Sequence, residues 1–292
     1  MKALAIYGII TGCALSIGIA GGIIYKRATS EEVDYGDFDA NALELDAAST
    51  LANYEKYKGN NPQEKFTPAE LITVGLEKYR RCEYSYSVGI GVADTVVKQS
   101  IRDFQIKNGD DYFEESISRS DMVKLADRVT QHGADGQVVI YRGQAIDDES
   151  GTYPPEGKSY ERQEYINYLG RSPDQMFIYT ISNVTVIEGN VEKTSDGYVI
   201  DVSLNPDYAT FHYKYQMFNV SGLDELPNFN YVKLKYTFDK DMMLKSLIVD
   251  EEYKAKMTIS VTIKNSIEFK YFPNQRMEIP KLDEPIDYSI GR

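Results

Sequence analysis

The chain has no tryptophan, and its 292 residues include only two histidines and two cysteines. His132 and His212 are far apart, and neither has a second histidine or a cysteine at the spacing of a zinc site. Cys13 lies in an apolar N-terminal segment, so Cys82 has no cysteine partner in the rest of the chain. We therefore predict no metal site, no disulfide framework and no cofactor.

Patterns typical of catalysis are also missing. Gly89-Ile90-Gly91 lacks the third glycine and the following helix of a dinucleotide-binding fingerprint. Ser116 and Ser118 lack the glycines of a nucleophile elbow. Adjacent acids such as Glu114 and Glu115 point to opposite faces of a strand, which makes them poor partners in general acid–base catalysis. The sequence predicts that the protein is not an enzyme.

Basic residues are in the minority, with 32 Lys and Arg against 45 Asp and Glu, for a net charge of −13. A surface this acidic repels the phosphates of nucleic acids and the headgroups of anionic lipids. We therefore exclude nucleic acid as a partner and expect no basic patch for a lipid surface.

The most prominent feature that is present is an uncharged N-terminal segment, residues 3–25, followed by Lys26 and Arg27. It is long enough to cross a hydrocarbon core of roughly 30 Å. A cleaved signal peptide would end its apolar region after roughly 7 to 15 residues, and this one continues to Ile24. Residues 10–13 are similar to a bacterial lipobox ending in Cys13, but another apolar dozen follows. All three interpretations stay open, and an uncleaved anchor is favoured.

Small residues recur every four positions in this segment. They are Gly8, Gly12 and Ser16 in one row and Gly18 and Gly22 in another. Such rows let two membrane helices approach closely, although glycine is common in membrane helices for other reasons as well.

The orientation in the membrane depends on the acidic residues, because positive charges flank the apolar segment on both sides. All 45 acids follow Arg27. We expect a single-pass protein of the cell membrane with its large acidic part outside. The low cysteine content suits the outer face of a bacterial membrane, particularly of a Gram-positive type.

The chain divides into an anchor (1–27), an acidic spacer (28–66), a folded domain (67–272) and a proline-containing extended tail (273–292). Seven acids and no base between Glu31 and Asp46 favour an extended spacer. A short amphipathic helix within it would share one face among Leu43, Ala47, Ala48, Leu51 and Tyr54.

The folded domain begins with a helix start at Thr67-Pro68-Ala69-Glu70, which combines an N-cap, proline at the first helical position and a capping-box glutamate. This helix should end near Arg81 and bury Leu71, Val74 and Tyr79.

Alternating apolar residues then predict successive strands. They cover residues 84–93, 96–106, 112–118, 138–141, 176–186, 198–204, 231–238, 243–249, 253–264 and 267–272. Turns are expected at Asn108-Gly109, Ser195-Asp196-Gly197 and Asn265-Ser266. Residues 122–129 fit neither period, and residues 160–169 predict a short helix.

One aromatic segment allows two interpretations. Alternation over residues 211–217 is typical of a strand, whereas Tyr208, Phe211, Tyr215 and Phe218 form a helical stripe. Asn205-Pro206 in front is a good helix start, so helix is favoured.

Together these elements predict an α+β fold, in which one large curved antiparallel sheet forms a half-barrel with helices packed on its concave face. A domain of this length can bury a sizeable core as one unit.

The order of elements carries a resemblance to a known family. A capped helix precedes successive hairpins and a short helix. The final strands include Tyr-Val-Lys-Leu-Lys-Tyr-Thr-Phe-Asp-Lys-Asp at 231–241 and Ile-Val-Asp-Glu-Glu-Tyr at 248–253. This layout resembles the LolA-like, or lipoprotein-carrier, superfamily of extracytoplasmic proteins. The resemblance implies a half-open barrel with an apolar interior that holds acyl chains, here tethered rather than shuttling.

The 24 tyrosines are the remaining unusual feature. They fit a tyrosine-rich sheet face. They also fit a binding surface, because tyrosine combines apolar area with a hydroxyl. In the second case the candidate ligand-binding residues at the mouth of a cavity are Tyr208, Phe211, Tyr213, Tyr215 and Phe218. Two functions follow: binding of a lipid-like or other apolar ligand, or contact with an envelope protein through a domain with a filled core.

Overall fold

The computed structural model of this chain describes residues 43–95, 97–121, 123–169, 172–173, 178–221, 223–256 and 260–291. The predicted membrane segment with its small-residue rows, Cys13 and residues 28–42 of the acidic spacer lie outside these residues. Within the described ranges, no helix has both the length and the apolar character needed to span a membrane.

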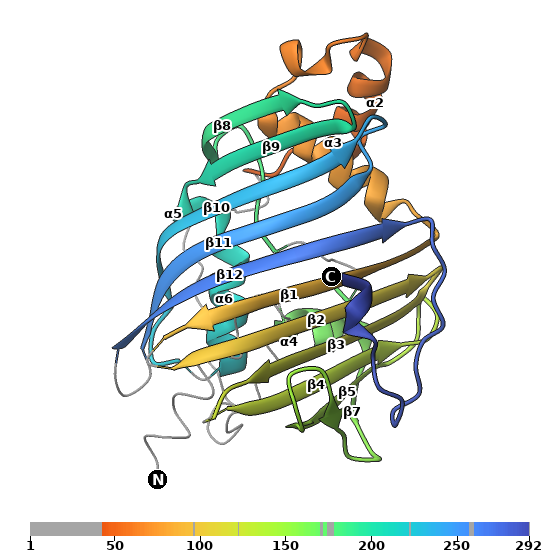
Figure 1. Cartoon of the computed structure of the whole chain (residues 1–292), viewed down its shortest axis with the longest axis vertical. Coiled ribbons are helices and arrows are strands. Elements are labelled where there is room, and N and C mark those ends of the chain that lie inside the picture. Colours follow the sequence, from red (N-terminus) through yellow and green to blue (C-terminus); the bar gives the residue numbers. More distant parts are fainter. Residues whose placement is uncertain are drawn as a thin grey trace.

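A single open antiparallel sheet organises the fold (Figure 1). At its centre, β1 (Tyr84–Asp94) pairs with β2 (Lys98–Asn108) on one side and with β12 (Ser260–Pro273) on the other. Beyond β2 lie β3 (Asp111–Arg119), β4 (Lys124–Gln131), β5 (Val138–Ala145) and the short β6 (Gly151–Thr152) and β7 (Lys158–Tyr160). Beyond β12 lie β11 (Leu244–Lys256), β10 (Asn228–Asp239), β9 (Gly197–Leu204) and the edge strand β8 (Val186–Lys193). The two edges do not pair with each other, so the sheet is not a closed barrel.

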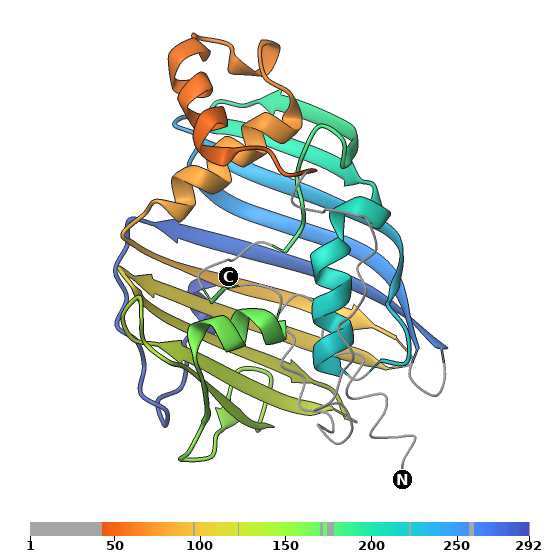
Figure 2. The same cartoon turned by 180° about the vertical axis from the view of Figure 1, so that it is seen from behind.

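The helices lie on one face of the sheet, which we call the helix face (Figure 2). They are α3 (Pro68–Arg80), α4 (Arg162–Leu169), α5 (Pro206–Ala209) and α6 (Phe211–Ser221). The helix α2 (Ala47–Tyr57) packs against α3 and buries Leu51 and Tyr54, and the short η2 (Pro62–Glu64) follows it. Part of the predicted spacer is thus packed against the rest of the fold.

The opposite, outer face is covered over only part of its width. The C-terminal segment crosses it in front of β1–β3 and ends in η3 (Tyr288–Gly291) (Figure 1). Tyr288 and Ile286 form a core there with Val88, Phe104 and Ile117. Strands β1–β3 are therefore buried on both faces, which explains their long runs of buried residues.

Several local predictions are confirmed. The helix α3 begins with the capping box of Thr67 and Glu70 and buries Leu71, Val74 and Tyr79. Gly109 has the positive φ of 61° that the predicted tight turn requires. The favoured helix after Asn205 is present as α5 and α6. The ambiguous residues 122–129 contribute most of β4.

The predicted strand at 176–186 is wrong where the structure describes it. Residues 178–182 are irregular, residues 183–185 form a turn, and the strand β8 begins at Val186. Hydroxyl groups bind the backbone locally in this stretch, because the Ser182 N–H donates to Thr185 Oγ1 and the Thr185 N–H donates to Ser182 Oγ. Such local bonds compete with a strand ladder.

The predicted strand at 253–264 and the turn at Asn265-Ser266 are also wrong. Residues 244–256 form one strand, β11, which pairs with β12 from Ser260 onward, so Asn265 and Ser266 lie inside β12. The hairpin pairs Lys256 with Ser260, so the chain returns with odd-numbered residues still facing the core. The alternation of apolar and polar residues is therefore the same on both strands, and it gives no sign that two strands are present.

Candidate functional site

The predicted aromatic residues lie on α5 and α6 but do not form one surface. Tyr208 on α5 is 40% exposed, whereas Tyr213 on α6 is buried against the rings of Tyr179 and Phe229. Phe211 and Tyr215, one helical turn apart, contact each other with ring centroids 4.9 Å apart.

The fifth predicted residue, Phe218, packs against the large cluster of buried apolar residues on the helix face, which we call the helix-face core. The structure therefore brings Phe211 and Tyr215 together, places Tyr213 and Phe218 in or against the core, and leaves Tyr208 at the surface.

Tyr213 reaches a buried carboxylate that sequence reasoning did not single out. Glu251 on β11 accepts hydrogen bonds from the hydroxyls of Tyr179 (2.6 Å) and Tyr213 (3.3 Å) and from Asn265 Nδ2 (2.7 Å). Burial raises the pKa of Glu251 to about 7. The signal was present in the sequence, because Glu251 is in phase with the inward-facing Val249 and Tyr253. This cluster ties α6 and the 178–185 segment to the sheet.

The helix face over β1–β4 combines buried polar side chains with the apolar Ile101, Tyr112 and Val129. Cross-strand register aligns Ser87, Gln105 and Glu114 in one row, and Asp103 lies opposite Ser116 in the next. Further buried polar residues on this face are Ser85, Gln99, Ser118 and Asp127.

Asp127 shows how far water is removed from this face. Burial raises the pKa of Asp127 to about 8, an effect that Arg142 opposes and Glu114 reinforces. A lining of this kind is unlike the apolar surface that an acyl chain requires.

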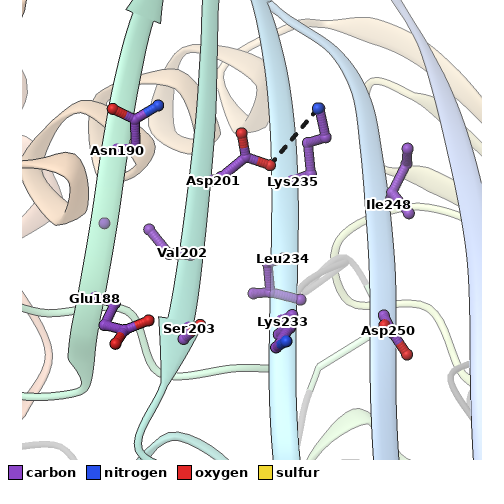
Figure 3. A pocket seen from close by; sticks show the side chains of 11 residues that line it. Glu188, Asn190, Asp201, Val202, Ser203, Lys233, Leu234, Lys235, Ile248 and Asp250 are labelled. Carbon is purple, nitrogen blue, oxygen red and sulfur yellow. Dashed lines mark ion pairs between the residues drawn. The ribbon is translucent and has the colours of Figure 1, made fainter.

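An open groove lies on the outer face of β8–β11 (Figure 3), a part of the sheet that the C-terminal segment does not cover (Figure 1). Its volume is about 360 Å³. Its lining consists of Glu188, Gly189, Asn190, Asp201, Val202, Ser203, Lys233, Leu234, Lys235, Ile248 and Asp250. Most of these side chains point outward because they alternate with the buried residues of the helix-face core.

Strand register arranges the groove side chains in two rows that cross four strands. The first row runs from Glu188 through Ser203 and Lys233 to Asp250. The second row runs from Asn190 through Asp201 and Lys235 to Ile248.

Charges of opposite sign are neighbours in these rows. Lys235 Nζ lies 3.7 Å from Asp201 Oδ1, and the Tyr231 hydroxyl donates to Asp250. Ile248, at the end of the second row, is 37% exposed. The arrangement places side chains of both charges beside one exposed apolar side chain.

No group of three or more His, Cys, Asp or Glu in the described part of the chain could hold a metal ion. Cys82 is buried, its thiol donates to the Lys78 carbonyl, and burial raises its pKa. Glu114 and Glu115 point to opposite faces, as predicted. Glu114 accepts from Tyr112, and Glu115 accepts from Tyr288 beneath the C-terminal segment.

Comparison with known proteins adds little to this geometry. No family model matches the chain, and no curated protein matches it. A solved structure of MucB in complex with MucA(peri) is 8% identical, covers 72% of this chain and 100% of that chain, and has a TM-score of 0.18.

Proposed function

We propose that this protein is a non-catalytic component of a bacterial cell envelope, anchored through residues 3–25, that binds a protein partner on the outer face of β8–β11. The groove carries this proposal. It presents two ordered rows of acidic, basic and amide side chains, with the exposed Ile248 at the end of the second row. Interfaces between proteins have a polar, solvent-accessible rim around a more apolar core, and these rows fit such a rim.

The apolar-ligand function receives less support from the helix face. Tyr213, Met217 and Phe229 fill the space between α6 and the sheet. Over β1–β4 the buried side chains of this face include Asp103 and Glu114. An acyl chain placed there would leave polar groups without water, at a cost of roughly 1–3 kcal/mol for each unsatisfied group.

The extracytoplasmic location and the relation to LolA-like proteins belong to the same proposal. The uncharged segment 3–25 and the acids that all follow Arg27 support the location. An open antiparallel sheet with helices on one face supports the half-barrel architecture.

Site-specific photo-crosslinking tests the proposal in the native membrane. A photoreactive residue at Ser203 or at Asn190 should give the same discrete product in full-length protein, and the exposed Asp135 position should not. Charge reversal at Lys233 and Lys235 should abolish the product. Equal products from all three positions, or none from the groove, would contradict the proposal.

Native mass spectrometry tests the apolar-ligand alternative on the same protein. The full chain would be purified in detergent and incubated with a membrane lipid extract. A bound lipid that is lost on Phe211→Asp and retained on Lys233→Glu would favour the cavity over the groove.

A further inference from the structure

The two edges of the sheet are protected unequally. At one edge β5 pairs with β6 and β7, whereas at the other edge β8 pairs, among the described strands, only with β9. Within the described residues, β8 makes one backbone hydrogen bond outside this ladder, from the Val186 N–H to the Ser182 carbonyl. Residues 187–190 are exposed, and Ile187 is 60% exposed. An edge of this kind presents backbone donors and acceptors to an incoming strand.

The side chains of β8 differ between its two faces. Glu188, Asn190 and Glu192 share the outer face, opposite Ser203, Asp201 and Val199 of β9. On the helix face, the backbone at Gly189 lies against Pro68, and Val191 packs against the core. The edge is therefore acidic on the outer face and small or apolar on the helix face.

We propose that β8 binds an extended basic segment of the partner protein as an added strand. The inference rests on the proposed function and specifies the class of partner. Residues directly opposite each other on paired strands share a face. Lysine or arginine at alternate positions of the added strand would therefore lie beside Glu188 and Glu192 on the outer face. The small apolar residues between them would lie beside Val191 on the helix face. Ladder hydrogen bonds would supply affinity, and the alternation would supply register.

A second copy of this chain is the other occupant to consider, and its charges oppose binding. Antiparallel pairing of two β8 strands about Asn190 would place Glu188 of each copy opposite Glu192 of the other. Like charges directly opposite each other destabilise strand pairing, and each chain carries a net charge of −13.

The probe for a direct test is a fluorescent peptide in which lysine alternates with valine, titrated against the full-length chain in detergent. A matched peptide carries an N-methyl group on every residue, so it keeps the charge but loses the backbone donors of both its edges. We expect the first peptide to bind, to slow hydrogen exchange in β8, and to bind at least tenfold more weakly when methylated.

Variants locate the binding site. Glu188→Lys with Glu192→Lys should weaken binding about tenfold. The same reversal at Glu156 and Glu278, which are exposed and lie outside the groove lining, should change it much less. Equal binding of both peptides, or equal effects of both variant pairs, would show non-specific attraction to an acidic protein and overturn the inference. Sedimentation showing a dimer that depends on β8 would replace the peptide with a second copy.

The two proposals can fail separately. Crosslinks from Ser203 without peptide binding would reject strand addition and retain the outer-face partner. Peptide binding without crosslinks from Ser203 would locate the partner at β8 and not across the groove.

Discussion

Arg128 on β4 lies directly opposite Glu115 on β3, and the two side chains form an ion pair that is almost completely buried. The guanidinium also donates to the backbone carbonyls of Lys281, Leu282 and Glu284 in the C-terminal segment. The Glu115 carboxylate additionally accepts from Tyr153 and Tyr288. One arginine therefore connects β3 and β4 to the C-terminal segment.

Removing this arginine should cost far more than removing an exposed one. Arg128→Met leaves the Glu115 charge buried without its partner, and we expect a loss of roughly 3–5 kcal/mol in the free energy of unfolding. Arg119→Met breaks a pair with Asp148 that is open to water and should cost about 1 kcal/mol or less. Urea unfolding of the two variants measures both values.

Limited proteolysis provides a second measurement for the same pair. If Arg128 holds the C-terminal segment in place, Arg128→Met should speed cleavage near Lys281, and Arg119→Met should not. Equal stability of the two variants would contradict the assigned role of Arg128.

Glu251 should make stability depend on pH near neutrality. Burial raises its pKa from 4.5 to about 7, so the folded state holds a proton that the unfolded chain releases. The stabilisation is present below about pH 4.5 and is lost as the pH rises through about 7, by up to about 3 kcal/mol.

The test compares unfolding of the wild type and Glu251→Gln between pH 5 and pH 8. The difference between their unfolding free energies should shift by roughly 2–3 kcal/mol over this range, in favour of the variant at high pH. Glu268→Gln, on the exposed side of β12, controls for the change in net charge. A difference that stays constant with pH would show that Glu251 is ionised throughout.

The sequence predicts most elements of this fold because their signals are local. The capping box at Thr67, the turn at Gly109 and the helix after Asn205 depend on residues within a few positions of one another. The sequence pattern does not reveal the hairpin between β11 and β12. Its register pairs Ala255 with Val261, so the alternation of apolar and polar residues is the same on both strands.

The candidate site could not be predicted in this way. Alternation indicates that Lys233 and Asp250 point outward, but it does not say what lies beside them. The groove depends on the register between β8, β9, β10 and β11, and on the C-terminal segment covering a different part of the same face. Pairing between distant strands, such as Ser85 with Pro273, leaves no local signal at all.

The aromatic residues of α5 and α6 should separate into structural and surface positions. Tyr213 is 2% exposed and donates to Glu251, so Tyr213→Ala should cost roughly 3–5 kcal/mol. Tyr208 is 40% exposed, and Tyr208→Ala should change stability by about 0.5 kcal/mol or less. Thermal unfolding measures both, and similar losses would show that Tyr208 also supports the core.

Gly75 on α3 tests how closely this helix approaches the sheet. Replacing a helical glycine by alanine normally stabilises a helix by about 1 kcal/mol. Here an ideal Cβ would lie 2.1 Å from Cε1 of Phe238. Phe238 is 1% exposed and stacks on Tyr236, so its ring has no free space to enter. Overpacking of this kind typically costs about 1–3 kcal/mol.

The overlap should outweigh the gain in helix propensity, and we expect Gly75→Ala to reduce the free energy of unfolding by about 1–2 kcal/mol. Phe238→Leu removes ring atoms that the new methyl group would meet. In the Phe238→Leu background Gly75→Ala should therefore cost less than it does alone, and a double-mutant cycle by urea unfolding measures the coupling. An increase in stability from Gly75→Ala alone would mean that α3 can move away from β10, and that its contact with Phe238 does not determine its position.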